Sequence, residues 1–301
     1  MSKDNLPQVS FFGIGLMGLP MASRISQAGY PLTAWNRTRA KAEPLLDVGA
    51  RVAEMPDAAR SADIVITMLE DGPVVLQVIT SILPLLRPGT LVIDMSSTRQ
   101  SEALQIHNLL KKHHVSFLDA PVSGGVLGAE EGTLAIMAGG SQADFERAEP
   151  VLKVMGRPTR VGPAGCGQLA KLCNQLIVGG TISIVAEALL LAQAGGADPA
   201  AVRAAIRGGF AESRVLDVHG QRMLDRNFIP GGQVKSQAKD MDNVLAAASD
   251  ASLQLPVAAL VTDLYHRIQD TFSHADQAAA LLALEELNPG KRVGDKKDRF
   301  K

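Results

Sequence analysis

Residues Val9 to Gly18 read V-S-F-F-G-I-G-L-M-G, a short apolar run followed at once by three closely spaced glycines. The run predicts a buried strand, and the helical spacing of Pro20–Ala28 beyond the glycines predicts a helix. Gly13 permits a tight turn, Gly15 lets the backbone approach a pyrophosphate, and Gly18 allows the helix to pack closely on the strand. This context favours a dinucleotide site over a glycine-rich turn without a ligand. The predicted contacts are Gly13, Ile14, Gly15, Leu16, Met17 and Gly18.

The first half of the chain alternates between apolar runs and stretches of helical period. Strands are predicted at Val9–Phe12, Leu32–Trp35, Asp63–Leu69, Leu91–Met95, Val115–Asp119 and Leu134–Ala138. Helices are predicted between them at Pro20–Ala28, Val74–Leu83, Thr98–Lys112 and Ala143–Met155. Because strands that alternate with helices are joined by right-handed crossovers, the pattern predicts an α/β fold with a doubly wound, mainly parallel sheet. We expect this N-terminal Rossmann domain to span residues 1–164.

Beyond residue 164 the strand signal stops and the helical period continues. Helices are predicted at about 166–194, 198–208, 214–225, 236–250, 256–271 and 275–287. We therefore expect an all-α C-terminal domain over residues 165–290, joined to the first domain by the long helix at 166–194. Residues 291–301 carry six basic and two acidic side chains, and we expect them to form a solvated, charged tail.

Composition narrows the class of protein. The chain has 301 residues, of which 46% are hydrophobic and 20% charged, as in a globular protein with a full core. A formal net charge of −1 lacks the basic footprint of a nucleic-acid-binding protein. Aromatic residues amount to 4%, too few for a platform on which bases stack. We expect a small-molecule ligand and no nucleic acid.

The cysteines, histidines and apolar segments suggest neither a metal nor a membrane. Cys166 and Cys173 are too far apart on one helix for a disulfide, so we expect two small core hydrophobes and a reducing, cytoplasmic compartment. No spacing of cysteine or histidine fits a metal site, so no metal is expected. The N-terminus lacks the pattern of a signal peptide. Leu176–Gly196 is charged only at Glu187, which we interpret as a helix buried between domains or subunits and not as a membrane span.

The residues that follow the second predicted strand bear on which dinucleotide binds. An NAD site usually has an acidic residue there, because a carboxylate accepts hydrogen bonds from the ribose 2′-OH. Here Asn36 removes that negative charge, and Arg37 offers a permanent positive charge to a 2′-phosphate. Asn36, Arg37 and Thr38 are therefore predicted cofactor contacts, with NADP preferred and NAD possible. The alternative is that Arg37 is an ordinary solvated surface charge.

Four further segments match one protein family. They read DAPVSGG at 119–125, GAEEGTL at 128–134, GCGQLAKLCNQ at 165–175, and Lys239-Asp240. With GIGLMGLPMA at 13–22, they resemble the β-hydroxyacid dehydrogenases, which include 3-hydroxyisobutyrate dehydrogenase, tartronate semialdehyde reductase (2-hydroxy-3-oxopropionate reductase) and short-chain glyoxylate reductases. The resemblance covers about residues 8–287, and Ile206 to Phe228 is most similar to tartronate semialdehyde reductase. It implies a Rossmann domain and a helical domain with a 6-phosphogluconate dehydrogenase-like fold, joined by one long helix.

The resemblance also implies roles for individual residues. The lysine matching Lys171 is the family's catalytic acid/base, and partial burial would lower the pKa of such a lysine toward the working pH. Asn174 and Gln175 follow three and four residues later on the same predicted helix, where the family contacts its substrate. Ser123, Gly124 and Gly125 match the loop that holds the substrate carboxylate. Cofactor contacts are implied at four further positions: Leu69, Glu70, Ser97 and Lys239.

These roles predict an oxidoreductase that interconverts a small β-hydroxyacid and its aldehyde or ketone. The best candidate reaction is the reduction of tartronate semialdehyde to glycerate with NADPH; the family's other substrates are 3-hydroxyisobutyrate, threonate, glyoxylate and succinic semialdehyde. Imine reductases resemble the family in fold but generally lack a lysine matching Lys171. A dinucleotide-binding sensor without turnover would tolerate the loss of Lys171, Asn174 and Ser123, yet all three are present. The family also implies a homodimer or homotetramer.

Overall fold

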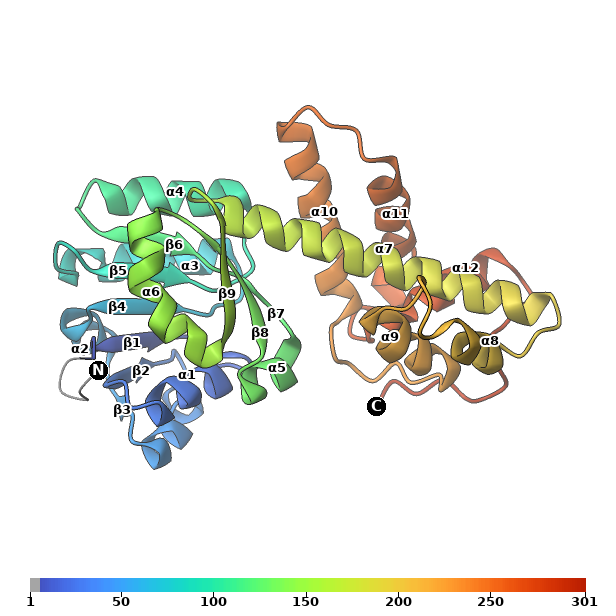
Figure 1. Cartoon of the computed structure of the whole chain (residues 1–301), viewed down its shortest axis with the longest axis horizontal. Helices are drawn as coiled ribbons and strands as arrows, with labels where there is room; N and C mark the ends of the chain where they lie inside the picture. Colours follow the sequence, from blue (N-terminus) through green and yellow to red (C-terminus); the bar gives the residue numbers. More distant parts are fainter. Residues whose placement is uncertain (1–5) are drawn as a thin grey trace. The chain divides into compact units, whose positions relative to one another are not determined.

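The computed structural model describes residues 6–301 and divides the chain into two compact units. One unit ends at Lys171, and the other runs from Leu172 to Lys301. The division falls inside the long helix α7 (Cys166–Ala194), whose first turns belong to the N-terminal unit and the rest to the C-terminal unit. The two units are described in turn (Figure 1).

The N-terminal unit is built on one nine-stranded sheet in the order β3-β2-β1-β4-β5-β6-β8-β7, with β9 paired to β8. Its strands are β1 (Val9–Phe12), β2 (Leu32–Trp35), β3 (Arg51–Val52), β4 (Ile64–Thr67), β5 (Leu91–Asp94), β6 (Ser116–Asp119), β7 (Val122–Ser123), β8 (Leu134–Gly139) and β9 (Gly156–Gly162). The run from β3 to β6 is parallel, whereas β8 is antiparallel to β6 and β7. The chain reverses direction across the sheet between β1 and β4, the point where doubly wound sheets bind their ligands.

Helices cover both faces of this sheet (Figure 1). The helices are α1 (Gly18–Gln27), α2 (Met55–Ser61), α3 (Gly72–Ile82), α4 (Gln100–Lys111), α5 (Gly125–Glu131) and α6 (Gln142–Met155), with 3₁₀ turns at Arg39–Lys41, Glu43–Val48 and Leu83–Leu85. Helices α1 and α6 pack on the strand residues of one face, and α2, α3 and α4 pack on those of the other. Because both faces are covered, strands β1, β4 and β5 are buried along their whole length and mostly apolar, and this is why sequence predicts them well.

Three strands and two short helices lie outside the sequence prediction. Strands β3 and β7 have two residues each, too few to show a period. Strand β9 runs through G-R-P-T-R-V-G and is mostly exposed, because it is an edge strand that pairs with β8 alone among the described strands. Its polar side chains face solvent, so it lacks the apolar alternation by which strands are recognised. Helix α2 and helix α5 span seven residues each, too few for a helical period to stand out.

The C-terminal unit is helical, as predicted. Its helices after α7 are α8 (Pro199–Ile206), α9 (Arg214–Leu224), α10 (Val234–Asp250), α11 (Pro256–Phe272) and α12 (Ala280–Leu287), with a 3₁₀ turn at Gln277–Ala279 before α12. Asp198 caps α8 by accepting from the backbone N–H of Ala200, and Ser213 caps α9 by accepting from that of Leu216. One apolar core joins these helices to α7 through residues such as Ile182 and Leu189.

Helix α7 combines a core face with an apolar exposed face. Within residues 6–301 it is the one helix long and apolar enough to cross a membrane by length and composition, and 44% of its most apolar window is buried inside the protein. Its buried apolar residues from Leu172 onward belong to the C-terminal core, whereas Ile177, Ile184 and Leu191 form an exposed apolar stripe at a spacing of seven residues. Our expectation that both cysteines are small core hydrophobes is wrong: Cys166 is half-buried and Cys173 is exposed.

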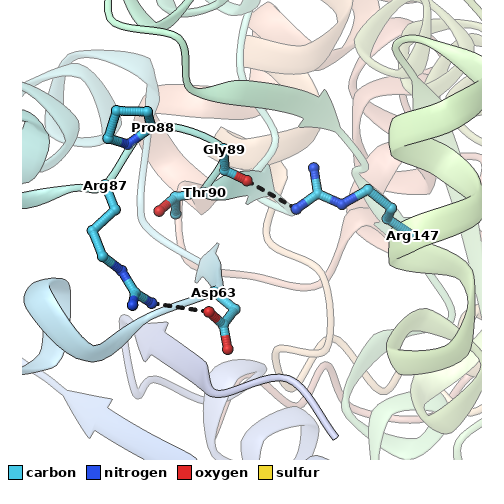
Figure 2. A pocket seen from close by; sticks show the side chains of 6 residues that line it. All are labelled: Asp63, Arg87, Pro88, Gly89, Thr90 and Arg147. Carbon is cyan, nitrogen blue, oxygen red and sulfur yellow. Dashed lines mark hydrogen bonds and ion pairs between the residues drawn. The ribbon is translucent and has the colours of Figure 1, made fainter. Parts of the chain in front are cut away.

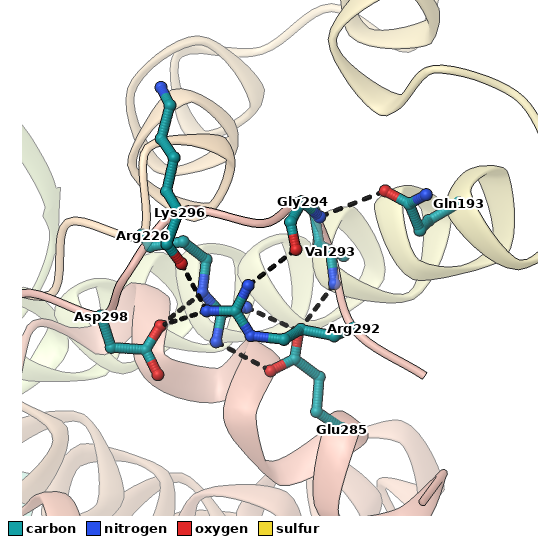
Figure 3. Close-up of polar contacts among 8 residues, drawn as sticks. All are labelled: Gln193, Arg226, Glu285, Arg292, Val293, Gly294, Lys296 and Asp298. Carbon is teal, nitrogen blue, oxygen red and sulfur yellow. Dashed lines mark hydrogen bonds and ion pairs between the residues drawn. The ribbon is translucent and has the colours of Figure 1, made fainter. Parts of the chain in front are cut away.

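Residues 291–301 do not form the solvated tail that their charges suggest. The tail runs back over the C-terminal unit, where Val293 is fully buried and its N–H donates to Glu285 at 2.9 Å (Figure 3). The Gly294 N–H donates to Gln193 on α7 at 3.1 Å. The ring of Phe300 stacks on those of Phe228 and Phe272, with centroids 5.6 and 5.3 Å away.

The charged side chains of the tail have specific partners. Arg226, at the end of α9, is 1% exposed; it donates to both oxygens of Glu285 at 2.6 and 2.9 Å and to Asp298 at 2.6 Å (Figure 3). Arg292 also donates to Asp298, at 3.1 Å. A buried guanidinium needs acidic partners, and here the tail supplies one of them. We call residues 291–301 the C-terminal strap from here on.

Candidate functional site

The loop between β1 and α1 has the geometry that a bound pyrophosphate requires. Gly13 has a positive φ of 103°, and a Cβ there would collide with the carbonyl oxygen of Met68. A Cβ on Gly18 would collide with the carbonyl oxygen of Gly13, so helix and strand are in close contact. A Cβ on Gly15 would meet no atom within 4 Å, and this leaves open space above the backbone. The three positions thus match a tight turn, close packing and an accessible backbone, and the loop fits a dinucleotide.

The other residues of this loop differ in exposure. Ile14 is buried in the core, Met17 is half-buried and Leu16 is 84% exposed. The backbone N–H of Ile14 donates to Asn36 Oδ1 at 2.9 Å, and Asn36 Nδ2 donates to the carbonyl oxygen of Thr38 at 2.8 Å. Asn36 therefore ties the end of β2 to the glycine loop, a positioning contact that the sequence does not reveal.

The charge beside this loop is basic. Arg37 and Thr38 follow Asn36 and are exposed, at the carboxyl end of β2. Arg39 forms an exposed ion pair with Glu54 at 3.5 Å, whereas the structure assigns Arg37 no acidic partner among residues 6–301. An arginine in this position is available to bind an anionic group of a ligand.

The loops that follow β4 and β5 are joined by a hydrogen bond at the carboxyl ends of these strands. The N–H of Leu69 donates to Ser96 Oγ at 2.9 Å, and this bond joins the two loops. Ser97 is half-buried beside Ser96, and Glu70 is exposed. Since β4 adjoins β1 in the parallel part of the sheet, these loops open at the same edge as the glycine loop.

The predicted acid lies beside the predicted carboxylate loop. Lys171 is on the second turn of α7, half-buried, and its Nζ donates to the carbonyl oxygen of Val122 at 3.0 Å. Val122 immediately precedes Ser123, which is half-buried. Gly124 and Gly125 follow with positive φ values of 136° and 65°, and both are exposed. The ammonium group and this loop therefore adjoin each other within the N-terminal unit.

A buried polar network lies behind these loops, and sequence reasoning missed it. Asp119 Oδ1 accepts from the Gly165 N–H at 2.7 Å and Oδ2 from the Gln168 N–H at 2.8 Å, so this carboxyl group caps the start of α7. Asp94, opposite Asp119 on β5, accepts from Thr67 Oγ1 at 2.8 Å. Burial raises the pKa of Asp94 to about 6. Burial raises the pKa of Asp119 to about 7, against the opposing effect of its two N–H bonds.

The remaining predicted residues belong to the C-terminal unit. Asn174 Nδ2 donates to Gln175 Oε1 at 2.9 Å, and Gln175 Nε2 donates to Asp240 Oδ2 at 2.7 Å. Lys239 is exposed, with its Nζ 3.8 Å from Asp240 Oδ1. Asp240 is 8% exposed and joins α7 to α10 through these contacts. The amide of Asn174 is therefore oriented through Gln175 by a buried carboxylate.

A shallow pocket on the N-terminal unit lies away from the glycine loop. It has a volume of about 280 Å³ and lies at the amino ends of β4 and β5, opposite the edge that carries the glycine loop (Figure 2). Arg87 donates to Asp63 at 2.9 Å, and Arg147 donates to the carbonyl oxygen of Gly89 at 2.9 Å. Both guanidinium groups thus have protein partners, and the pocket has no feature of the dinucleotide site.

The fold and this edge of the sheet define a dinucleotide-dependent oxidoreductase. Residues 8–167 match the NAD binding domain of 6-phosphogluconate dehydrogenase, and residues 165–284 match the family described as NAD-binding of NADP-dependent 3-hydroxyisobutyrate dehydrogenase. The chain belongs to the β-hydroxyacid dehydrogenase family, and it is an NAD(P)-dependent enzyme that acts on a hydroxyl group.

Individual relatives agree with this family. The chain is 39% identical to 2-hydroxy-3-oxopropionate reductase of Escherichia coli over 92% of its own length and 97% of that protein. It is 36% identical to a probable 3-hydroxyisobutyrate dehydrogenase-like protein of Arabidopsis thaliana, over 93% and 86% of the two chains. Among solved structures, 3-hydroxyisobutyrate dehydrogenase of Mycobacterium tuberculosis superposes with a TM-score of 0.86 at 30% identity, over 93% and 99% of the two chains. An imine reductase of Myxococcus stipitatus shares the fold alone, at 21% identity.

Proposed function

We propose that this chain reduces tartronate semialdehyde to glycerate and prefers NADPH, with Lys171 as the general acid. The observation that carries the proposal is the contact of Lys171 Nζ with the Val122 carbonyl oxygen, 3.0 Å away and one residue before Ser123. An ammonium group held there lies beside the loop that we assign to the substrate carboxylate. It is therefore close to the carbonyl oxygen of a substrate that is only three carbons long.

The proposed roles follow from the donors that each residue offers. Ser123 Oγ–H and the N–H groups of Gly124 and Gly125 donate to the substrate carboxylate, since both glycines are exposed and successive N–H groups of such a loop can bind an anion. Asn174 hydrogen-bonds the substrate, with its amide oriented by Gln175. In reduction Lys171 Nζ gives a proton to the carbonyl oxygen as it becomes a hydroxyl; in oxidation the neutral amine takes that proton back.

We assign the dinucleotide a set of contacts. The residues are Gly13, Ile14, Gly15, Leu16, Met17 and Gly18 for the pyrophosphate, Asn36, Arg37 and Thr38 for the adenosine end, and Leu69, Glu70, Ser97 and Lys239 for the remainder. Arg37 is exposed beside the glycine loop and would pair with a 2′-phosphate, which supports NADP over NAD. When bound, the nicotinamide supplies hydride transfer; the chain's own residues orient the two reactants and handle the proton.

The choice of substrate rests on the names of the relatives. The Escherichia coli relative is named 2-hydroxy-3-oxopropionate reductase, and 39% identity over nearly the whole chain supports the same substrate class. The 3-hydroxyisobutyrate dehydrogenases are the second candidate, because three relatives and one solved structure carry that name at 30–36% identity. We further propose a cytoplasmic homodimer or homotetramer whose subunits cover the apolar stripe of Ile177, Ile184 and Leu191 on α7.

A substrate screen tests the proposal. The aldehydes tartronate semialdehyde, glyoxylate and succinic semialdehyde are assayed in reduction with NADPH and with NADH. The hydroxyacids 3-hydroxyisobutyrate and threonate are assayed in oxidation with NADP+ and with NAD+. The highest kcat/KM is expected for tartronate semialdehyde with NADPH. A second arm compares 3-hydroxyisobutyrate with its amide, since the Ser123–Gly125 donors require an anion. Equal kcat/KM for acid and amide would remove the carboxylate assignment. A higher kcat/KM for another acid would replace the proposed substrate.

A further inference from the structure

Gln168 connects three elements of the N-terminal unit. It lies on the first turn of α7, and its side chain is fully buried. Its Nε2 donates to the Ser96 carbonyl oxygen at 2.8 Å, and its Oε1 accepts from the Thr98 N–H at 3.0 Å. One amide thus binds the residues on both sides of Ser97. Its own backbone N–H donates to Asp119 at 2.8 Å, which anchors the same residue to the end of β6.

The network extends in both directions from Gln168. Ser96 Oγ accepts from the Leu69 N–H at 2.9 Å, so the loop after β4 is held by the same residue that Gln168 holds. In the other direction, Lys171 follows Gln168 by three residues on the same helix. A Cβ on Gly167 would collide with the carbonyl oxygen of Asp119, so the start of α7 lies in close contact with the end of β6. A rigid link thus joins the two loops to the helix that carries the lysine.

We propose that Gln168 is a positioning residue that fixes the cofactor loop at Ser97 and the acid Lys171 relative to each other. The proposal rests on the function proposed above, because Ser97 and Lys171 have their roles only in that reaction. An amide suits this task because it offers a donor and an acceptor at once and carries no charge at any working pH. A glutamate in its place would keep the acceptor for Thr98 but would donate to Ser96 only when protonated.

This difference makes the pH dependence of Gln168→Glu a specific test. The titratable groups of the surrounding network are Asp94 on β5, Asp119 on β6, Glu102 on α4 and Lys171 on α7. Burial near the aspartates raises the pKa of the introduced carboxyl, so it is protonated at low pH and ionises as pH rises. Below that pKa the protonated carboxyl donates to the Ser96 carbonyl oxygen. Above it, a carboxylate oxygen faces the Ser96 carbonyl oxygen without a hydrogen, and the loop that contains Ser97 is no longer held.

The experiment measures kcat and the Kd of NADPH for wild type and variants between pH 6 and pH 8.5. For Gln168→Glu, the ratio of kcat to wild type is expected to fall about tenfold across this range, and NADPH affinity to weaken in parallel. Gln168→Met, which loses both side-chain bonds, is expected to show about a tenfold loss that does not vary with pH. Gln77→Glu, on the exposed face of α3, is the matched control and should follow wild type throughout.

The readouts separate a positioning role from a purely structural one. Thermal unfolding of each variant is recorded at the same pH values. If both Gln168 variants lose Tm while their kcat and NADPH affinity stay within twofold of wild type, Gln168 only stabilises the fold and the inference is overturned. A ratio for Gln168→Glu that is flat with pH overturns it as well. If wild type turns over no β-hydroxyacid but the NADPH affinity of Gln168→Glu still falls with pH, the proposed function fails while the link to the cofactor loop stands.

Discussion

Replacing Asp298 with alanine tests whether the C-terminal strap is part of the folded C-terminal unit. The Asp298 carboxylate accepts from Arg226 Nε at 2.6 Å and from Arg292 at 3.1 Å. Asp298→Ala leaves the Nε–H of a guanidinium that is 1% exposed without this acceptor, while Glu285 keeps its two bonds to the same group. A hydrogen bond to a charged group contributes about 1.5–3 kcal/mol. We therefore expect the free energy of unfolding to fall by about that amount, less than the 3–5 kcal/mol or so for complete loss of a buried pair.

The assay is urea unfolding of the full chain followed by far-UV circular dichroism, to which the helices of both units contribute. Trp35 lies in the N-terminal unit, so its fluorescence reports separately on that unit. Asp295→Ala is the matched control, because Asp295 is an exposed residue of the same strap, and it should change stability by no more than about 0.5 kcal/mol. If Asp298→Ala and Asp295→Ala unfold at the same urea concentration, the contacts of Asp298 with Arg226 and Arg292 do not contribute to stability.

Three further outcomes follow from the structure. The pKa of Asp94 is about 6 in the folded state and about 3.9 in the unfolded state, so the folded state binds more protons between these two values. The free energy of unfolding therefore falls as pH rises from about 4 to 6. Asp94→Asn should remove roughly 2–3 kcal/mol of that fall, measured by unfolding at a series of pH values. NADPH should be favoured over NADH by about ten- to a hundredfold in kcat/KM at low salt, and Asn36→Asp with Arg37→Ala should reverse the order; equal values in wild type would refute the 2′-phosphate assignment. Light scattering should show a dimer or tetramer at micromolar concentration and a smaller species for Ile184→Glu, because the charge falls within the apolar stripe of α7; a monomeric wild type would contradict this.

Among the strands, those that sequence predicts well are buried on both sides. Strand β1 and the loop from Gly13 to Gly18 follow from an apolar run and three glycines that are close together in sequence. Strand β9 could not be predicted, because Arg157, Thr159 and Arg160 face solvent at the sheet edge and the strand exists only through its pairing with β8. The long helix α7 agrees with the helix predicted at about 166–194, and its C-terminal end is marked by the glycine pair that follows it.

The same distinction separates the predicted from the missed residues of the site. Lys171 and Ser123 lie in short segments that match family motifs. Gln168 and Ser96 are 72 residues apart, and the bond between them uses a backbone carbonyl, which no side-chain pattern records. Arg226 and Asp298 are likewise 72 residues apart, so the charged composition of residues 291–301 predicts a solvated tail and does not indicate their ion pair. Contacts of this kind depend on the tertiary fold and are visible only in the structure.

The most direct test of the central claim is the turnover of wild type and Lys171→Ala with tartronate semialdehyde and NADPH. General acid catalysis contributes roughly 10²–10⁴-fold, so kcat should fall by two to four orders of magnitude in the variant while the Kd of NADPH stays near that of wild type. Lys112→Ala, an exposed lysine at the end of α4, serves as control and should retain full activity. If Lys171→Ala keeps more than about a tenth of the wild-type kcat, Lys171 is not the acid and the proposed mechanism is wrong.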